Sequence, residues 1–244
     1  MRKTSKVFVW LLGAVIMCAS AARPAEAIPI TWSASGSGGD GHLYAEADFT
    51  ISAGGQIVVK ITNLLNPAII KSAGQAVSDL SFTISNDPGT NTSNTANGNL
   101  VTVNKDGSVT SATGTPGRWV NLESGLGNFN INGKIITLEA IGGGKPTELI
   151  LPADGGGGYP SSNSSINQNF SPFVDGPATF TLNLSGVTSQ TTITAVTFSF
   201  GTSPDTFLTG VPGLLPPPAP EPGTLFLLGS GLCGLAAWRR RWSK

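Results

Sequence analysis

The chain has 244 residues with 14 basic and 14 acidic side chains, so its formal net charge is zero. Only 11% of residues are charged, against roughly 25% in an ordinary soluble domain. The sequence has no basic patch, which argues against a nucleic-acid-binding protein. One histidine and two cysteines leave few ligands for a zinc or haem site, and the low content of Leu, Glu and Lys argues against a helical bundle.

Residues 1–27 have the three parts of a secretory signal peptide, which directs a chain to the Sec translocon. A basic start precedes an apolar stretch at 7–22 that is too short for a stable membrane anchor. Small residues then mark a cleavage site, and its residues are Ala25, Ala27 and Ile28. Lipoprotein processing at Cys18 is the alternative, but Met17 stands where a small residue is normal.

Alternation of apolar and polar residues predicts a series of short strands in residues 28–212. Turn signals separate them at Gly54-Gly55, Asp106-Gly107 and Asn132-Gly133. One helical turn is expected near 67–71. The expected strands are 43–51, 56–64, 77–85, 100–103, 109–112, 129–131, 134–140, 178–184 and 193–200.

These elements predict an all-β body, an antiparallel β-sandwich with a jelly roll as one version of it. Two polar stretches, 86–99 and 142–177, show no alternation and are expected to be long loops. The body is flanked by the signal helix and by a single transmembrane helix near the C-terminus.

The C-terminal segment has a tripartite pattern. A proline-rich spacer at 213–219 leads to Pro-Glu-Pro at 220–222, and an apolar run follows at 223–238. At about 1.5 Å per residue, 16 helical residues make ~24 Å, which spans a membrane if the bilayer thins locally. The run ends at Arg239, Arg240 and Arg241, which should stay in the cytoplasm.

This pattern resembles the PEP-CTERM sorting signal, found on exported proteins of Gram-negative bacteria that make exopolysaccharide. The resemblance covers residues 220–244 and implies that an exosortase, a membrane protease-transpeptidase, recognises the signal and removes the tail. It implies an inner-membrane-anchored intermediate and then the cell surface or matrix, and it leaves the body unassigned. The residues that match the signal's first part are Pro220, Glu221, Pro222, Gly223 and Thr224.

Without its two ends the chain differs in net charge and in cysteine content. The body keeps six basic and twelve acidic residues, a net charge of −6, which disfavours anionic partners such as nucleic acids. Both cysteines, Cys18 and Cys233, lie in the removable ends, so the body has no disulfide. A body of this size can bury a sufficient core without one.

Few residues of the body are candidates for a catalytic or metal-binding role. His42 lies near Glu46 and Asp48, but no nucleophile motif accompanies it, so a surface position is expected. Asn104, Asp106 and Ser108 resemble part of a calcium loop, and a hairpin turn explains them better. Calcium binding by other loops is an alternative, and its candidate ligands are Asp87, Asp154 and Asp175.

Aromatic residues offer a different chemistry, since exposed rings can stack on sugars. The candidates are Trp32, Trp119, Tyr44 and Tyr159, although in a sandwich such rings usually fill the core.

From the sequence as a whole we expect a non-enzymatic surface or matrix protein with no catalytic residues, cofactor or metal. The alternatives are a module that binds exopolysaccharide and a secreted hydrolase.

Overall fold

The computed structural model describes residues 29–52, 54–120, 128–142, 144–203 and 206–213. This part of the chain is mostly β-strand, which confirms the all-β prediction. The strands are β1 (Ile30–Gly38), β2 (Gly41–Ser52), β3 (Gln56–Asn63), β4 (Val77–Ile84), β5 (Asn91–Val103), β6 (Val109–Ser111), β7 (Asn128–Asn132), β8 (Ile135–Glu139), β9 (Ile150–Leu151), β10 (Phe173–Leu184), β11 (Ile193–Phe200), β12 (Thr206–Thr209) and β13 (Val211–Pro212). The short helical turns are η1 (Pro67–Ile69), η2 (Ala73–Gln75), η3 (Gly117–Val120) and η4 (Ser165–Asn169).

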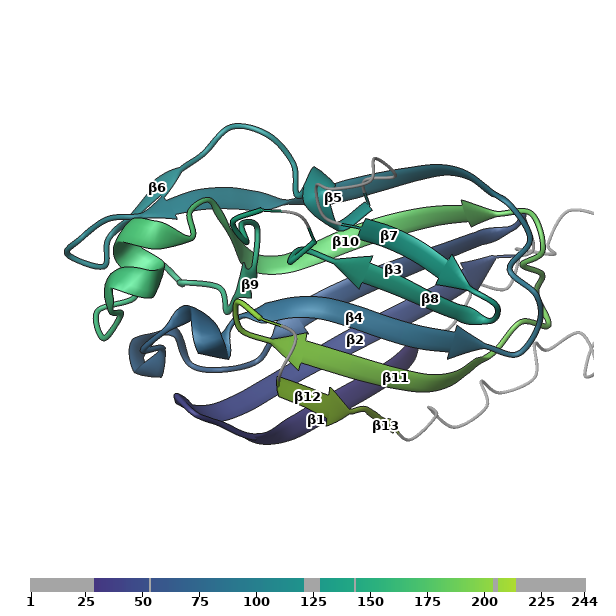
Figure 1. The fold of residues 1–244 in the computed structure, drawn as a ribbon, viewed down its shortest axis with the longest axis horizontal. Helices are drawn as coiled ribbons and strands as arrows, with labels where there is room; N and C mark the ends of the chain where they lie inside the picture. The colour runs from purple at the N-terminus through teal and green to yellow at the C-terminus, as the bar shows by residue number, and fades with distance from the viewer. Residues whose placement is uncertain (1–28, 53, 121–127, 143, 204–205, 214–244) are drawn as a thin grey trace, which may run out of the picture.

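The strands lie in two facing layers (Figure 1). Hydrogen bonds join β6, β5, β10, β3, β2, β1 and β13 in one layer, and β7, β8, β4, β11 and β12 in the other. The rings of Phe49 on β2 and Phe82 on β4 meet between the layers at 5.0 Å between centroids. Inward residues of both layers therefore share one core.

The predicted sandwich of two antiparallel sheets is correct only in part. Strand β9 pairs parallel with β10 at Val174 and antiparallel with β4 at Val77, so all thirteen strands belong to one mixed sheet. The strand order also differs from a jelly roll, because β1, β2 and β3 are consecutive neighbours. Sequence alternation did not reveal β9, since its two residues are both buried and lie in an irregular segment.

Besides the short strands β9, β12 and β13, two longer stretches of strand lie where none was predicted, namely β1 and the first part of β5. Strand β1 is rich in Ser and Gly, and its inward positions include Trp32 and Ala34. The first part of β5 occupies the predicted loop 86–99 and is almost entirely Asn, Thr and Ser. Both pair along most of their length with stronger strands, β2 and β10, so tertiary pairing overrides weak local propensity.

The hydrophobic core of the described residues lies within the body. Every buried hydrophobic residue of the described chain lies between Trp32 and Phe200. Trp119 is fully buried and stacks on Phe180 at 5.2 Å between ring centroids, which fixes η3 against β10. A body without the two ends of the chain therefore keeps every core residue that the structure describes.

Polar side chains anchor the long segment 142–177, which was expected to be a loop. Asn63 Nδ2 on β3 donates to the carbonyl oxygens of Gln75 at 2.9 Å and Ile150 at 3.2 Å. The Tyr159 hydroxyl lies 2.7 Å from the carbonyl oxygen of Pro152 and 2.8 Å from Oδ1 of Asp175. Burial and the Asp175 carboxylate raise the Tyr159 pKa well above its usual range, so the hydroxyl keeps its proton. These bonds hold the segment at one end of the layers.

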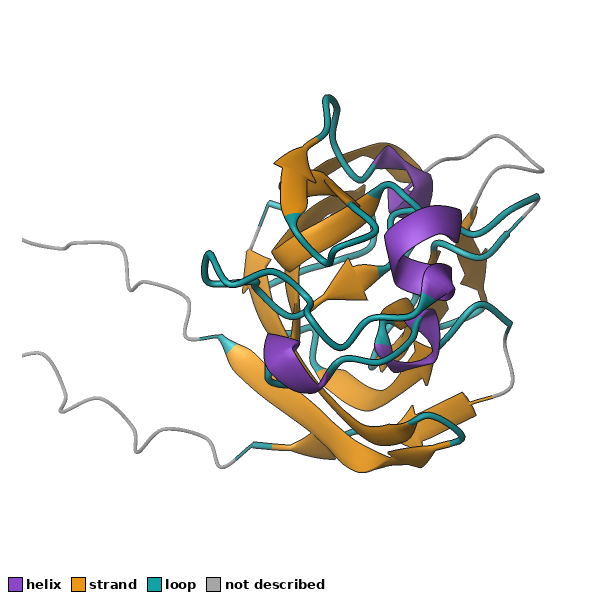
Figure 2. Cartoon of the chain, turned by 90° about the vertical axis from the view of Figure 1, so that its left-hand side faces the viewer, coloured by secondary structure: helices purple, strands orange, loops and turns teal. Residues whose placement is uncertain are grey.

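The helical turns η1, η2 and η4 gather at that end, which faces the viewer in Figure 2. The predicted turn near 67–71 is confirmed as η1, capped by Asn66 Oδ1, which accepts from Ala68 N at 2.9 Å.

The two ends of the described chain lie together at the opposite end (Figure 1). The amide of Gly213 donates to the carbonyl oxygen of Thr31 at 2.7 Å, and β13 pairs with β1 at Trp32. The predicted signal helix and transmembrane helix lie outside the described residues. Among the residues that are described, no helix is long and apolar enough to cross a membrane.

Candidate functional site

The residues predicted for export and sorting lie outside the described residues. They are Ala25, Ala27 and Ile28 at the leader cleavage site, Pro220, Glu221, Pro222, Gly223 and Thr224 in the sorting motif, and Arg239, Arg240 and Arg241 in the arginine cluster. Their roles stay predictions from the sequence. The spacer 214–219 also lies outside the described residues, whereas the body is described almost throughout.

His42 lies on an exposed part of β2, with Glu46 and Asp48 further along the same face. Its nearest ring partner is Tyr44, with 6.4 Å between centroids. Asp48 instead accepts from Thr31 Oγ1 at 2.6 Å and lies 3.9 Å from Lys60 Nζ. Partial burial, and next the Asp48 charge, raise the pKa of Glu46. The structure thus places these groups along one strand, and the residue opposite His42 in the register is Ser37 of β1.

The predicted turn chemistry explains Asn104, Asp106 and Ser108. Asp106 Oδ1 accepts from the backbone amide of Ser108 at 3.0 Å and from its hydroxyl at 2.6 Å, which lowers the Asp106 pKa. Asn104 Nδ2 donates to Ser108 Oγ at 3.0 Å. These oxygens close the hairpin between β5 and β6, which confirms the expected turn.

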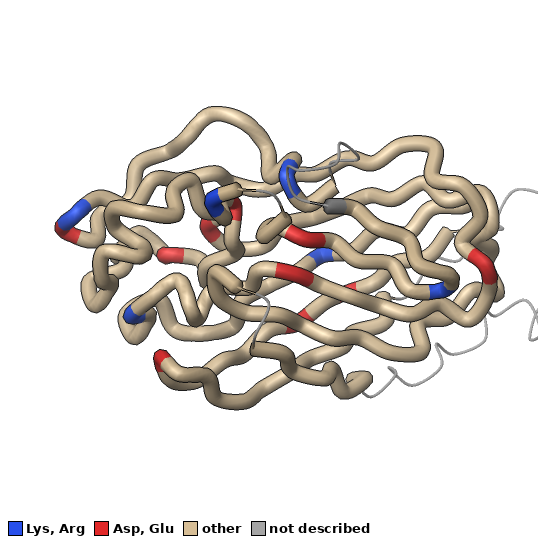
Figure 3. The backbone as a smooth tube through the Cα atoms, in the orientation of Figure 1, with Lys and Arg blue, Asp and Glu red and all other residues tan. Residues whose placement is uncertain are grey.

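The other candidate calcium ligands also serve the fold. Asp87 Oδ1 accepts from Gly89 N at 2.8 Å, and Asp175 Oδ1 accepts from Asp154 N at 2.8 Å. Among the residues described, no group of three or more His, Cys, Asp or Glu side chains could hold a metal ion. Figure 3 shows how thinly the acidic and basic residues are spread over the described chain.

Three of the four aromatic candidates for sugar stacking are buried. Trp119 and Tyr159 are inaccessible, and Trp32 is 7% exposed, so these rings pack the core as such rings usually do. Tyr44 is the exception at 37% exposed, and it stands on the outer face of β2. The sequence could not separate Tyr44 from the others, because exposure depends on which layer covers each ring.

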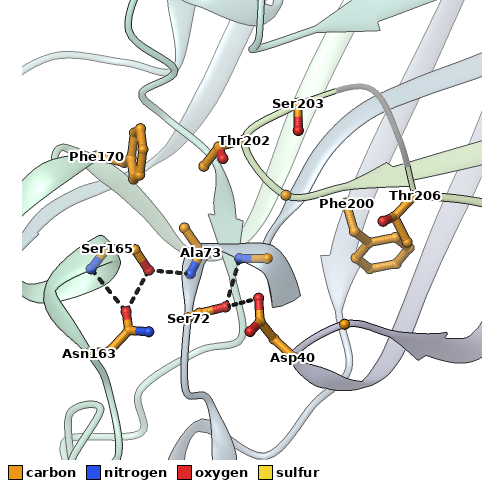
Figure 4. Close-up of a pocket in the computed structure, with 13 residues that line it drawn as sticks. Asp40, Ser72, Ala73, Asn163, Ser165, Phe170, Phe200, Thr202, Ser203 and Thr206 are labelled. Atoms are coloured by element: carbon orange, nitrogen blue, oxygen red, sulfur yellow. Dashed lines mark hydrogen bonds between the residues drawn. The ribbon is translucent and has the colours of Figure 1, made fainter.

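The structure reveals a polar pocket that the sequence did not indicate. It has a volume of about 360 Å³, within the range of sites that hold small molecules. Four segments distant in sequence meet there (Figure 4): the β1–β2 turn, η2, the start of η4 and the chain after β11. Its lining combines small polar residues with two aromatic rings; the side chains are Asp40, Ser72, Ala73, Asn163, Ser165, Phe170, Phe200, Thr202, Ser203 and Thr206.

Ser72 joins two of these segments at the floor of the pocket. It is the N-cap of η2: its Oγ accepts from Gly74 N at 3.0 Å and donates to Asp40 Oδ2 at 2.5 Å. A Cβ on Gly74 would lie 2.2 Å from the same carboxylate oxygen, so glycine is needed for this approach. The carboxylate of Asp40 is thereby held in a fixed place although the residue is exposed.

The opposite wall comes from the segment that leads into η4. Ser165 Oγ accepts from Ala73 N at 2.9 Å and donates to Asn163 Oδ1 at 2.6 Å. Asn163 N donates to the carbonyl oxygen of Lys71 at 2.8 Å, which ties the wall to η2. Phe170 closes this side as a half-buried ring, and Lys145 Nζ lies 5.7 Å from its centroid. The pocket thus offers one carboxylate, several hydroxyls, an amide and an aromatic surface.

A buried carboxyl group lies elsewhere, on β4. Asp79 is 6% exposed, and its neighbours across the sheet are Glu139 on β8 and Ser199 on β11. Its Oδ2 accepts from Ser78 Oγ at 3.2 Å, and no described residue bonds to its Oδ1. Burial, and next the charge of Glu139, raise the Asp79 pKa to about 7.

Glu148 is a second carboxyl group with a raised pKa, again mainly through burial. Its Oε2 accepts from Arg118 N at 2.9 Å, and its carbonyl oxygen accepts from Trp119 Nε1 at 2.8 Å. The Arg118 guanidinium donates to the carbonyl oxygens of Ala140 and Gly142. Since these bonds tie η3 to the chain after β8, this group has a structural role.

Comparison with known proteins separates the tail from the body. No curated protein and no solved structure shows significant similarity to the chain. Residues 218–241 match the PEP-CTERM protein-sorting motif, as the tripartite pattern predicted, and this motif implies an exported protein that is sorted by an exosortase. The chain therefore carries a PEP-CTERM sorting motif at its C-terminus, and the match does not extend into the β-structured body.

Proposed function

We propose that this protein is a non-enzymatic component of the cell surface or extracellular matrix of a Gram-negative bacterium. In this proposal the signal peptide delivers the chain to the Sec translocon, and the C-terminal helix holds it in the inner membrane until an exosortase removes the tail. The match of residues 218–241 to the sorting motif carries the proposal. The weakly charged body, which has no cysteine and needs no disulfide, is consistent with it.

Fractionation of cells that express Glu221→Ala tests this route. We expect the variant to keep its tail and to stay in the inner membrane, while the wild type reaches the surface without it. Lys105→Ala, an exposed substitution in the β5–β6 turn, is the control and should behave as the wild type. Surface delivery of Glu221→Ala with its tail removed would contradict processing by an exosortase.

A second candidate function is carbohydrate binding at the polar pocket. Sugars present vicinal hydroxyls and an apolar ring face, so proteins bind them with carboxylates, amides and aromatic rings. Asp40, Asn163 and Phe170 supply these three kinds of group around one cavity. The bond from Ser72 to Asp40 orients the carboxylate before any ligand arrives, which lowers the entropic cost of binding.

Binding of the purified body to a glycan array and to the host's own polysaccharide tests this function. Asp40→Asn keeps the shape of the side chain and removes its charge, and we expect it to weaken binding about tenfold or more, which is 1.4 kcal/mol. Phe170→Ala should weaken binding as well. Tyr44→Ala is the matched aromatic control outside the pocket. Equal binding by all four proteins, or by none, would exclude the pocket as the site.

A further inference from the structure

We propose that two copies of this chain associate through the free edge of β5, in an antiparallel pairing of residues 91–97 with the same residues of the second copy. The interaction extends the layer β3–β10–β5 across a two-fold axis. It does not depend on the function proposed for the pocket.

Among the described strands, only β10 pairs with this stretch of β5, and it does so along one edge. Residues 91–97 lie beside β10, and β6 covers the other edge only from Val101 to Val103. In the described part of the chain no further strand pairs with residues 91–97. Seven residues at about 3.3 Å each make an edge of ~23 Å, long enough for stable register.

The hydrogen-bonding pattern shows which backbone groups face the free edge. Leu184 N donates to the carbonyl oxygen of Gly55 at 2.7 Å, so the even-numbered residues of β10 bond to β3. The odd-numbered residues of β10 therefore bond to β5, through Ser93, Thr95 and Asn97. It follows that Thr92, Asn94 and Ala96 direct their amide and carbonyl groups away from β10, toward the edge.

The edge has few of the features that usually prevent pairing. Natural proteins protect edge strands with charged residues, prolines or bulges. Residues 91–97 contain no charge and no proline. One register shift lies at the start of this segment, between Asn91 and Ser93, and residues 93–97 pair with β10 without a shift. Strand β7 is also at an edge, but it has only five residues.

The sequence of the edge complements itself. In an antiparallel pairing centred on Asn94, Thr92 lies opposite Ala96 and Asn94 opposite its own copy, which gives about six backbone hydrogen bonds. Ser93 then lies opposite Thr95 of the second copy, so that hydroxyls pair across the strands. An uncharged strand also avoids like-charge repulsion between two acidic bodies. Because a single strand pair buries less than a standard interface, we expect a weak dimer.

Sedimentation of the body over a wide range of concentrations tests this pairing. We expect the wild type to shift from monomer to dimer as concentration rises. Ala96→Pro removes an outward amide without breaking a bond to β10, and should keep the body monomeric with its fold intact. A wild type that stays monomeric throughout, or an Ala96→Pro variant that dimerises as the wild type does, would overturn the proposal.

A charge exchange tests the site independently of proline. Thr95→Lys and Thr95→Glu each place like charges close together across the two-fold axis, so neither variant alone should dimerise at low salt. An equimolar mixture should dimerise at least as well as the wild type. Thr50→Lys, on β2 and distant from the edge, is the matched control and should dimerise normally. Failure of the mixture to associate, with folded components, would exclude this edge.

Discussion

Asp79 on β4 lies directly opposite Glu139 on β8, and it is the more deeply buried of the two carboxyl groups. Burial disfavours the ionisation of Asp79, and the charge of Glu139 disfavours it further. The pair therefore introduces a pH-dependent destabilisation into the layer that contains β4.

Asp79→Asn should remove this pH dependence. The folded-state pKa of Asp79 is raised to about 7 from 3.8, so between these values the unfolded chain releases a proton that the folded chain retains. The free energy of unfolding should therefore fall as pH rises from about 4 to 7, by at most ~4 kcal/mol for this group. Thermal unfolding across this range measures the effect, and Asp79→Asn should be flatter and more stable at pH 8. A wild type whose stability rises steadily through this window would contradict the prediction.

Tyr159→Phe should destabilise the body. The substitution removes the hydroxyl that lies between Pro152 and Asp175, so the carbonyl oxygen of buried Pro152 loses this donor, while Asp175 Oδ1 keeps the bond from Asp154 N. The expected loss is about 1–3 kcal/mol in the free energy of unfolding, measured by urea denaturation. Tyr44→Phe is the control, because its ring is 37% exposed, and it should change stability by no more than ~0.5 kcal/mol. Equal effects of both substitutions would show that the Tyr159 hydroxyl has no structural role.

Gly74→Ala should act through Asp40. The added Cβ would displace the Asp40 carboxylate and break its bond to Ser72, at a cost of about 1 kcal/mol. In the Asp40→Ala background the same change should cost much less, so a double-mutant cycle should give a coupling of ~0.5 kcal/mol or more. Strictly additive effects would show that Gly74 and Asp40 do not constrain each other.

Trp119→Ala should be among the most damaging substitutions in the body. It removes a fully buried ring that stacks on Phe180, and we expect a loss of about 3–5 kcal/mol. Trp119→Phe leaves the Glu148 carbonyl oxygen without its donor, so it should also lower the free energy of unfolding. Because it keeps an aromatic ring, this loss should be smaller than that of Trp119→Ala. Phe207→Ala, at 55% exposed, is the control and should have little effect. Denaturant titration of the three variants measures this order.

Sequence alternation was sufficient for the strands with a clear apolar face. It predicted β3, β4, β10 and β11, and turn residues such as Gly107 and Gly133 marked the hairpins correctly. The prediction missed β1, although Ile30, Trp32 and Ala34 alternate with polar residues there, and it missed the first part of β5, where Asn, Thr and Ser carry no periodic signal. Their partners impose the strand conformation, and pairing between distant segments cannot be read from a local window.

The pocket was beyond sequence analysis for a related reason. Asp40, Ser72, Asn163 and Thr202 belong to four separate segments, and each is ordinary in its local context. Only the fold brings them together, after Ser72 caps η2 and Ser165 binds the backbone of the same turn. The C-terminal sorting motif, in contrast, is a contiguous sequence pattern, so it could be identified without the structure.

The pairing of β13 with the beginning of β1 has a consequence for how the molecule is presented. Both the leader and the tail join the body at the end where Gly213 bonds to Thr31, whereas Asp40 lies at the other end of β1. Eight residues of strand at about 3.3 Å each place the pocket ~26 Å from this attachment point. A body held by its C-terminus would therefore direct the pocket outward, away from whatever holds it.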